Sequence, residues 1–459
     1  MTKKVCVIGL DGASPLLINA WLDELPTFRR FRDEGLWGRS IPPLPAQTPV
    51  AWTTFMTGQN PGKHGIFSFI QRVPGSYQRR IAAPSFIRSD SLWQILSGHG
   101  KRVGVINVPM STYTGINGFM IPGFLDHHEG IPQPRSVAEN IQKLFHVSTM
   151  PGDVETEFLA QARSNPDALL NRIEEITALN AEISLYLLEH EPWDFFMAVF
   201  MGTDRIGHFF WNHIDPTHPQ YVQNAFTDRA KRYYRSVDTI LAEFLKRLPS
   251  DTLMVLISDH GFCPVTQEIF INNYLQDHDY LHVHDEKVDV AQSLAVAYGY
   301  GDIWLNVAGR EPSGRIHPGG EYHRIRDAII AALQRIRING AAPIQQVVKR
   351  EDIYWGPYVA EAADLIAIHN RNWQSARRPE ILLQATTHDY IRDTPLWSGG
   401  HDGSHNPEEV PGILGFLGPR LDTQRSPLTA RLWDVAPTLL HYLDIPVPQA
   451  MDGQPIVLG

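Results

Sequence analysis

Short runs of hydrophobic residues recur along the chain, and most are followed by polar or charged residues. Runs of this length are typical of strands buried on both faces, as in a parallel sheet. Segments with helical spacing lie between them, so the chain predicts an α/β fold with a mostly parallel central sheet and helices on both faces. The predicted strands are 5–10, 103–108, 195–200, 253–257 and 412–418, and the predicted helices are 14–22, 26–34, 49–56, 153–190 with a break near 165, 220–247 and 432–443.

Residues 263–390 interrupt this regular alternation. They contain a loop rich in histidine and aspartate, a glycine- and proline-rich turn, a predicted helix over 322–338 and two strand-like segments, DIWLNV and DLIAIH. We therefore expect a smaller α+β cap that is inserted beside the sheet and shapes the substrate pocket. Residues 1–262 and 391–459 then form the catalytic core.

Composition narrows the class of protein. The 459 residues are 43% hydrophobic, enough for a large core, and the net charge of −10 gives no overall positive field for a nucleic acid polymer. Two cysteines indicate no disulfide framework. No apolar run approaches the roughly 20 residues of a membrane span. We expect a cytoplasmic protein, and the sequence leaves open whether it forms a homo-oligomer.

Acidic residues and histidines gather at the ends of the predicted strands. Ligands of open α/β sheets bind beyond the carboxyl ends of the strands, and carboxylates with imidazoles there predict a metal site. The residues that follow an apolar run are Asp11, Asp204, His208, Asp259 and His260. A late histidine, His401 or His405, precedes the run at 412–418.

Thr48 is a candidate nucleophile. It directly precedes Pro49, a favoured first residue of a helix. The free N–H groups and the dipole of a helix start favour anions, and a hydroxyl ionised beside a dication can attack an electrophilic centre. An ordinary helix N-cap is the alternative interpretation. The nucleophile hypothesis therefore depends on the neighbouring ligand candidates.

Taken together, these segments resemble the alkaline phosphatase superfamily and, within it, the type I phosphodiesterase/nucleotide pyrophosphatase family. The similar segments occur in the order of the family and are GLDG at 9–12, TPVAWTTFMTG at 48–58, PGKHGI at 61–66, TDRIGH at 203–208 and SDHGF at 258–262. The resemblance implies an alkaline-phosphatase-like core and a metal-dependent phosphoester hydrolase. A phosphodiesterase is favoured.

The resemblance also implies two divalent metal ions, usually zinc, with manganese as the alternative. It implies one ion held by Asp11, Asp259, His260 and Thr48, and another held by Asp204, His208 and the late histidine. Thr48 would attack the phosphorus of a small-molecule phosphoester and form a phosphothreonine, which water then hydrolyses. Two cations about 4 Å apart suit such an in-line displacement.

Two histidines compete for the late ligand position. His401 lies seventeen residues before Gly418, which resembles the spacing in nucleotide pyrophosphatases. His405 lies in GSHNPEE, which resembles a shorter form in other members but requires an insertion near 410–411. The spacing favours His401. The other histidine is then a neighbour of the site or a substrate contact.

The chain departs from the family pattern at Phe69, twenty-one residues after Thr48. The resemblance implies an asparagine here that binds a phosphoryl oxygen, whereas a phenylalanine side chain offers no hydrogen-bond donor. Nucleotide substrates are therefore less expected. The candidate substrate contacts are Lys63, Asn107 and Arg310, with a surface loop as the alternative role of Lys63 and a structural salt bridge as that of Arg310.

Other functions stay open beside the phosphodiesterase. A phosphomonoesterase or a phosphomutase of the same superfamily is one alternative, although mutases need further residues that retain the phosphoryl group. A metal-stabilised binding protein without turnover is another, and the presence of Thr48 together with every ligand candidate argues against it. A sulfatase is disfavoured because TPVA at 48–51 lacks the cysteine or serine that sulfatases modify.

Overall fold

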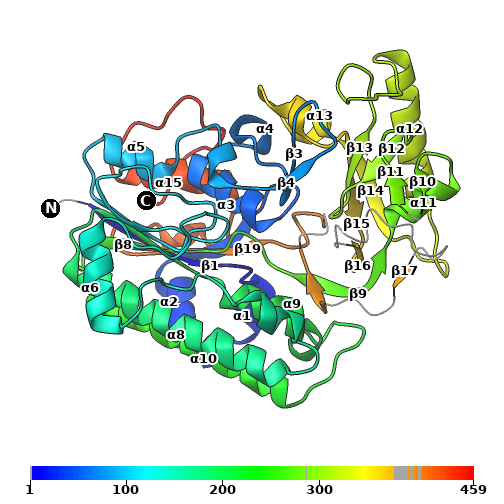
Figure 1. Cartoon of the computed structure of the whole chain (residues 1–459). Coiled ribbons are helices and arrows are strands. Elements are labelled where there is room, and N and C mark those ends of the chain that lie inside the picture. Colours follow the sequence, from blue (N-terminus) through cyan, green and yellow to red (C-terminus); the bar gives the residue numbers. More distant parts are fainter. Residues whose placement is uncertain (1–2, 286, 377–390, 393–396, 402–404) are drawn as a thin grey trace.

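The computed structural model of the chain describes residues 3–285, 287–376, 391–392, 397–401 and 405–459. An eight-stranded sheet crosses its larger part (Figure 1). From one edge to the other the strands are β20 (Leu428–Arg431), β2 (Leu36–Ile41), β19 (Gly412–Leu417), β8 (Thr252–Ile257), β1 (Lys4–Leu10), β7 (Phe195–Phe200), β5 (Val103–Ile106) and β6 (Gly118–Ile121). The predicted α/β class with a mostly parallel central sheet is confirmed.

One strand of this sheet corrects the sequence analysis. β19 pairs antiparallel with both β8 and β2, whereas the apolar run at 412–418 was predicted to be a parallel strand. An apolar run reports burial but not direction. Because β19 is reversed, the segment before it reaches the same edge of the sheet as the carboxyl ends of β1 and β8.

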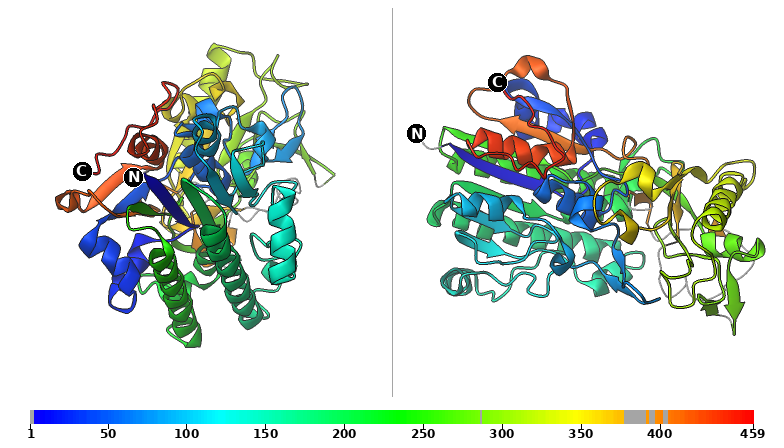
Figure 2. Two further views of the ribbon diagram at one scale, coloured as in Figure 1. Left: turned by 90° about the vertical axis from the view of Figure 1, so that its left-hand side faces the viewer. Right: turned by 90° about the horizontal axis from the view of Figure 1, so that it is seen from above.

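Helices cover both faces of the sheet (Figures 1 and 2). Successive strand residues point to opposite faces, so Ile8 joins one apolar core and Val7 the other. The first core is covered by α1 (Pro15–Ala20), α2 (Pro26–Glu34), α6 (Arg135–Phe145), α8 (Pro166–His190), α9 (Gly202–Ile214) and α10 (Ala225–Arg247), with α7 (Thr156–Ala160) beside α8. The second is covered by α3 (Thr48–Thr57), α5 (Leu92–Gly98) and α15 (Val435–Tyr442), with α4 (Pro61–His64) beside α3.

A second structural unit lies beside the sheet, at the end opposite the two termini (Figure 1). Its four-stranded antiparallel sheet has the order β12 (Ala295–Ala297), β13 (Asp302–Leu305), β15 (Leu365–His369) and β14 (Ile344–Lys349). α11 (Ile271–Asp277), α12 (Gly320–Gln334) and α13 (Arg350–Ile353) accompany it, with the hairpin β10 (His282–His284) and β11 (Lys287–Asp289). We refer to residues 271–369 as the cap. They lie within the predicted insertion, of which residues 286 and 377–390 are outside the described residues.

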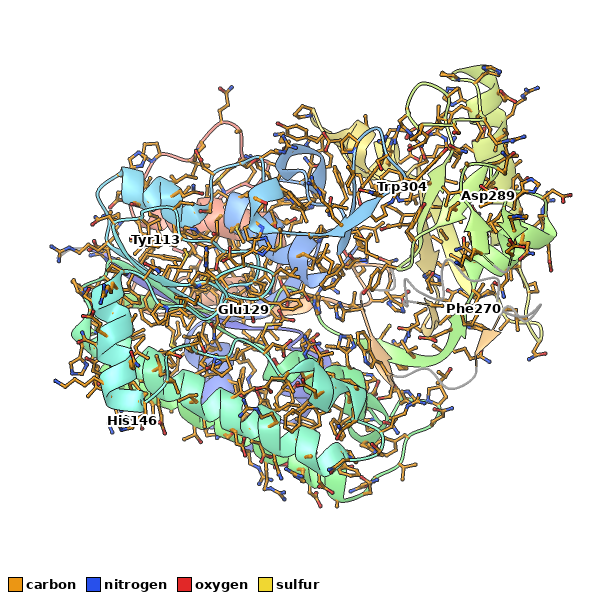
Figure 3. The ribbon with its side chains drawn as sticks, viewed as in Figure 1. Tyr113, Glu129, His146, Phe270, Asp289 and Trp304 are labelled. Atoms are coloured by element: carbon orange, nitrogen blue, oxygen red, sulfur yellow. The ribbon has the colours of Figure 1, made fainter. Side chains whose placement is uncertain are left out.

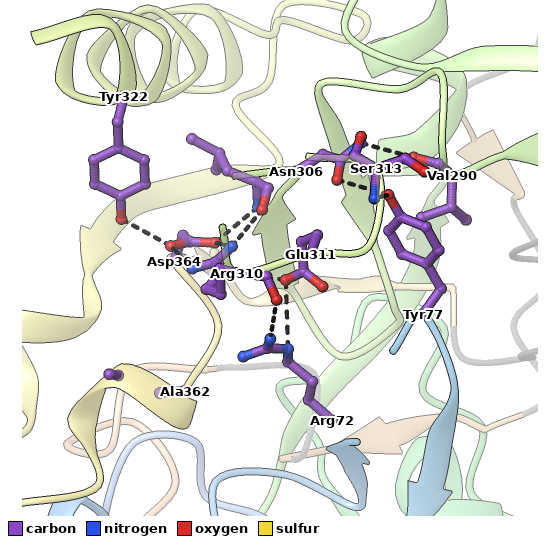
Figure 4. Close-up of polar contacts among 12 residues, drawn as sticks. Arg72, Tyr77, Val290, Asn306, Arg310, Glu311, Ser313, Tyr322, Ala362 and Asp364 are labelled. Atoms are coloured by element: carbon purple, nitrogen blue, oxygen red, sulfur yellow. Dashed lines mark hydrogen bonds and ion pairs between the residues drawn. The ribbon is translucent and has the colours of Figure 1, made fainter. Parts of the chain in front are cut away.

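Two elements connect the core with the cap. β9 (Cys263–Ile269) leaves the core after β8 and pairs with β16 (Asn372–Ser375), β17 (Ile391–Arg392) and β18 (Gly399–Gly400). The hairpin of β3 (Ile70–Arg72) and β4 (Arg79–Ile81) contacts the cap, where the hydroxyl of Tyr77 donates to Oδ1 of Asn306 at 3.0 Å (Figure 4). Within the described part of the chain, no helix has the length and apolar character needed to cross a membrane.

Candidate metal centre

The candidate ligands come together beyond the carboxyl ends of three parallel strands. Asp11 follows β1, and Asp259 follows β8, the strand paired with β1 on one side. On the other side of β1, β7 leads directly into α9, which carries Asp204 and His208 four residues apart on one helix face. The parallel register therefore places side chains from distant parts of the sequence at one edge of the sheet.

Each of the three carboxylates has one oxygen in a polar contact, a hydrogen bond for Asp11 and Asp259 and an ion pair for Asp204. Trp52 Nε1 donates to Asp11 Oδ2 at 2.7 Å, and the backbone N–H of Gly12 donates to Asp259 Oδ1 at 3.1 Å. The guanidinium of Arg205 lies 3.1 Å from Asp204 Oδ2. The other oxygens, Asp11 Oδ1, Asp204 Oδ1 and Asp259 Oδ2, are buried and make no hydrogen bond with any described residue. Three carboxyl oxygens are thus available to a cation.

The three histidines of the site share one orientation. In each ring Nδ1 faces a backbone carbonyl oxygen, which only accepts, so the neutral ring carries its proton on Nδ1. The Nδ1–oxygen distances are 3.1 Å for His208 and Gly399, 3.2 Å for His260 and Gly261, and 2.7 Å for His401 and Ala46. Nε2 is then the unprotonated nitrogen of each ring, as metal coordination requires.

These atoms form two adjoining clusters. The ligand atoms of Asp204, His208 and His401 lie within 4.8 Å of one another, and so do those of Asp11, Asp204 and His260. Nε2 of His401 and His208 are 3.2 Å apart, a repulsive contact for two lone pairs unless a proton or a cation lies between them. Oxygen and imidazole ligands of this kind fit divalent zinc or manganese.

Asp259 lies at the edge of the second cluster. Its Oδ2 is 3.0 Å from Nε2 of His260, which is in turn 3.7 Å from Oδ1 of Asp11. The rings of His260 and His401 stack with their centroids 3.4 Å apart, so the two clusters share a wall. The structure thus brings Asp11, Asp204, His208, His260 and His401 together, with Asp259 beside them, and His401 is the late histidine that lies in a cluster.

Burial and like charges make this centre electrostatically unfavourable without a cation. Burial, reinforced by the charges of Asp259 and Asp204, raises the pKa of Asp11 well above its ordinary value. Burial likewise raises the pKa of Asp259 to about 8. For Asp204, burial alone would raise the pKa, but the neighbouring His208 and Arg205 outweigh it and lower the pKa. A bound dication would relieve the repulsion among these carboxylates.

Thr48 is the first residue of α3, and residues on either side of it in the sequence contact the two clusters. Ala46, two residues before it, accepts the hydrogen bond from His401. Trp52, one helical turn after it and on the same helix face, donates to Asp11. Thr48 is only 4% exposed, and Pro49 occupies the next position of the helix. The start of α3 is thereby fixed against the metal centre.

Two residues considered from the sequence lie in other contacts. Nε2 of His405 is 2.8 Å from the carbonyl oxygen of Trp373, and His405 is outside both clusters. Lys63 Nζ lies 2.6 Å from Asp452 Oδ1 and donates to Ala450 O at 3.0 Å. His405 is therefore a neighbour of the site and is in neither cluster. Lys63 is held by structural contacts.

Arg310 is also held by structural contacts, in the cap (Figure 4). Its guanidinium forms two 2.7 Å hydrogen bonds with the carboxylate of Asp364 and lies 3.1 Å from Glu311 Oε1. Asp364 is fully buried and also accepts from the Tyr322 hydroxyl at 2.7 Å. The bidentate pair favours the salt-bridge alternative for Arg310.

Asn107 differs from Lys63 and Arg310. It directly follows β5 in a left-handed conformation with φ of 54°, which ends the predicted strand 103–108 at Ile106. The residue is 1% exposed, and neither Oδ1 nor Nδ2 of its amide makes a hydrogen bond with the described residues. A buried amide without partners is expensive, so its two polar groups are available to a ligand.

Phe69 lies close to the nucleophile segment. Its backbone N–H donates to Oε1 of Gln47, the residue before Thr48, at 2.8 Å. Its ring stacks on Tyr300 of the cap, with centroids 5.7 Å apart, and meets Phe124 edge-on at 6.4 Å. An aromatic cluster from the core and the cap therefore stands where the family resemblance implies an amide.

Sequence analysis missed the donors that hold the carboxylates. These donors are Trp52, Arg205 and the N–H of Gly12. Arg205 was adjacent to a ligand candidate in TDRIGH, which is a usable signal. The backbone contact of Gly12 has no side-chain signal, although a glycine with φ of 67° next to Asp11 marks a turn that other residues adopt only with strain.

Comparisons with known proteins give the same class of protein as the sequence resemblance. A family model described as type I phosphodiesterase/nucleotide pyrophosphatase matches residues 5–394. No curated protein matches the chain significantly. Human ectonucleotide pyrophosphatase/phosphodiesterase 5 superposes with a TM-score of 0.58 at 16% identity, covering 99% of this chain and 97% of that one. Phosphonoacetate hydrolase from Sinorhizobium meliloti, solved with phosphonoformate, has a TM-score of 0.57 at 16% identity and covers 96% and 95%.

The fold and the family match define a hydrolase of the alkaline phosphatase superfamily that acts on phosphoester bonds. The chain belongs to the type I phosphodiesterase/nucleotide pyrophosphatase family. The structural likenesses, at 16% identity, show the shared fold.

Proposed function

We propose that this protein is a metal-dependent phosphodiesterase for small molecules, with Thr48 as its nucleophile and two divalent ions, zinc or manganese, in the adjoining clusters. The observation that carries the proposal is that three carboxylate oxygens, without hydrogen bonds among the described residues, meet the Nε2 atoms of three histidines whose Nδ1 atoms face carbonyl oxygens, beside the start of α3. Nothing in a structural core requires such a combination, which is costly when left uncompensated.

The two ions would be held by separate sets that meet at Asp204. One set is Asp11, Asp259 and His260 with Thr48, and the other is Asp204, His208 and His401. Bound divalent ions lower the pKa of a coordinated hydroxyl and stabilise negative charge on phosphoryl and departing oxygens. The N–H groups at the start of α3 add a fixed positive potential for the substrate anion.

Thr48 then carries out the bond exchange. Its deprotonated Oγ forms a bond to phosphorus, and the bond from phosphorus to the departing oxygen breaks with its electron pair on that oxygen. The products are an alcohol, which takes up one proton, and a phosphothreonine that still carries the other ester group of the substrate. Water next attacks phosphorus from the vacated side and the Thr48 Oγ departs, so the enzyme is restored and a phosphomonoester is released.

Asn107 and Phe69 suggest how the substrate is oriented. The unpartnered Asn107 amide supports a role as a donor to a phosphoryl oxygen, in place of the asparagine that Phe69 replaces. The aromatic cluster of Phe69, Phe124 and Tyr300 supports a substrate whose departing group is apolar rather than a second phosphate. A phosphodiester with an aromatic or aliphatic ester group meets both conditions better than a nucleotide pyrophosphate.

The test is hydrolysis of bis-p-nitrophenyl phosphate and p-nitrophenyl phosphate by protein stripped of metal and refilled with Zn²⁺ or Mn²⁺. Metal-dependent turnover that favours the diester is the expected result. Turnover favouring the monoester would instead identify a phosphomonoesterase or mutase. Bound metal without hydrolysis of either ester would contradict the proposal and support a binding role.

A further inference from the structure

Among the described residues, Asp204 is the one carboxylate whose ligand atom belongs to both clusters. It is also the one of the three carboxylates that forms an ion pair with a guanidinium, that of Arg205. We propose that Arg205, fixed in turn by Asp153, is a positioning residue that binds Oδ2 of Asp204 and keeps Oδ1 directed at the metal centre. The inference rests on the proposed two-metal function and adds to it the Arg205–Asp153 pair, which contacts no reacting atom.

The contacts divide the two oxygens of Asp204 between different partners. Arg205 Nη1 lies 3.1 Å from Oδ2. Oδ1 makes no hydrogen bond and lies 3.4 Å from Nε2 of both His208 and His401. A carboxylate bound in this way on one oxygen cannot rotate without losing a charge-assisted contact, so the orientation of its other oxygen is fixed.

Asp153 fixes the guanidinium itself. Arg205 Nε donates to both carboxylate oxygens of Asp153, at 2.9 and 3.0 Å, and Nη2 donates to one of them as well. This fork occupies the Nε edge of the guanidinium and leaves Nη1 for Asp204. Arg205 is 9% exposed, so the pair exchanges little with water. A lysine has no planar fork and cannot make both contacts in this geometry.

The segment that carries Asp153 is itself anchored to the core. Asn180 of α8 donates to the carbonyl oxygen of Pro151 at 2.8 Å, and the N–H of Met150 donates to Gly130 at 2.8 Å. Glu129, labelled in Figure 3, lies in the neighbouring loop after β6, where burial and the charge of Asp153 raise its pKa to about 7. The position of Asp153 is therefore set by contacts of its own segment as well as by Arg205.

The charge of Arg205 and its positioning of Asp204 predict opposite changes in metal affinity when Arg205 is lost. A guanidinium next to the centre repels metal cations, so its loss should strengthen metal binding if Arg205 only contributes charge. If Arg205 orients Asp204, its loss should weaken binding at the cluster of Asp204, His208 and His401. Groups that orient metal ligands typically contribute 10- to 100-fold to metal affinity.

The experiment is calorimetric titration of the metal-free full chain with Zn²⁺. Arg205→Lys keeps the positive charge, and Asp153→Asn keeps Arg205 while weakening its anchor. Each is expected to weaken the Zn²⁺ site of Asp204, His208 and His401 by about 10-fold and to affect the other site less. His208→Ala identifies which site belongs to the Asp204 cluster. The double variant is expected to lose little beyond Arg205→Lys, because the two residues act as a unit.

A matched control tests for a merely structural role. Arg172 Nε donates to Glu155 at 3.0 Å, two residues beyond Asp153, but touches no candidate ligand. Arg172→Gln should therefore leave both Zn²⁺ affinities unchanged. Equal weakening in Arg172→Gln, equal loss at both sites, or unchanged affinities in Arg205→Lys and Asp153→Asn would overturn the inference. Wild-type protein that binds no Zn²⁺ would instead refute the proposed function before any variant is compared.

Discussion

At the scale of single residues, the proposed ligands and nucleophile of the metal centre differ from the residues that only orient the carboxylates. The ligand residues contribute oxygen or nitrogen atoms to the site, whereas Thr48 contributes a hydroxyl at the start of α3, and Trp52 and Arg205 only hold carboxylates. Substitutions should therefore separate turnover from metal content, because a residue that performs chemistry need not determine metal affinity.

Thr48→Ala is expected to abolish hydrolysis of bis-p-nitrophenyl phosphate while retaining most of the bound metal, since the carboxylates and histidines remain. Metal analysis of the purified variant beside its rate provides the measurement. Thr48→Ser keeps a hydroxyl at the helix start and serves as the control that retains measurable turnover. A Thr48→Ala enzyme with a rate near that of the wild type would eliminate the covalent mechanism.

Trp52→Phe removes the Nε1–H that holds Asp11 Oδ2 but keeps an aromatic ring in the core. We expect Zn²⁺ affinity to fall by about 10-fold, because the orientation of Asp11 is no longer fixed. Trp193→Phe is the matched control, since its indole is also buried and donates to Leu188 O at 2.9 Å, before the start of β7 and so at the opposite end of the strand from the ligands. The same fall in both variants would indicate general damage to the core.

The residue types of the site could be predicted from sequence, but their partners could not. Acidic and imidazole residues at strand ends already indicated a metal site. Whether Lys63 and Arg310 face a substrate or a carboxylate depends on Asp452 and Asp364, which are distant in sequence. No local pattern reports such long-range pairings, so the structure was needed to distinguish the alternatives.

At the scale of elements, the nucleophile helix α3 is held by the short helix α4 that follows it. His64 of α4 is fully buried, accepts from the N–H of Ile66 through Nδ1 at 3.2 Å, and has Nε2 3.0 Å from the hydroxyl of Thr54 in α3. Nε2 therefore carries the proton, and the ring is neutral. Burial lowers its pKa to about 3.

This histidine predicts an acid-sensitive link between α3 and α4. The folded pKa is below the unfolded value near 6.5, so the unfolded chain binds more protons, and stability falls as pH decreases from about 6.5 toward 3. His64→Gln should be less stable than the wild type at pH 7.5 but lose less stability between pH 7.5 and 5. Urea unfolding at both values measures this, and parallel losses in the two proteins would contradict it.

Elements were predictable where the apolar pattern was continuous. β1, β7, β8 and α2 match their predicted ranges to within one residue because each is buried along its length or has a clear apolar face. β2 and β20 were missed because they lie toward one edge of the sheet and contain polar residues. The direction of β19 depends on the path of the chain through the cap, which a short apolar run does not encode.

At the scale of the whole molecule, two buried aspartates at one edge of the sheet, Asp11 and Asp259, oppose folding in the absence of a cation, because burial raises the pKa of each. One oxygen of each carboxyl group lacks a hydrogen bond among the described residues. The surrounding apolar cores and the cap must compensate for this arrangement. Metal binding should consequently stabilise the entire fold and not only the site, because the unfolded chain has no preformed site.

Removing metal with a chelator is expected to lower the unfolding temperature, and returning Zn²⁺ to restore it. At a free concentration 100 times the dissociation constant, each ion contributes about 2.7 kcal/mol. Asp11→Asn removes an ionisable group whose burial is costly, as its raised pKa shows, so its metal-free form should unfold at a higher temperature than metal-free wild type, yet gain less from Zn²⁺. Differential scanning calorimetry of both proteins with and without metal tests this. If metal-free Asp11→Asn were no more stable and gained as much from Zn²⁺, Asp11 would be neither a ligand nor a source of the repulsion.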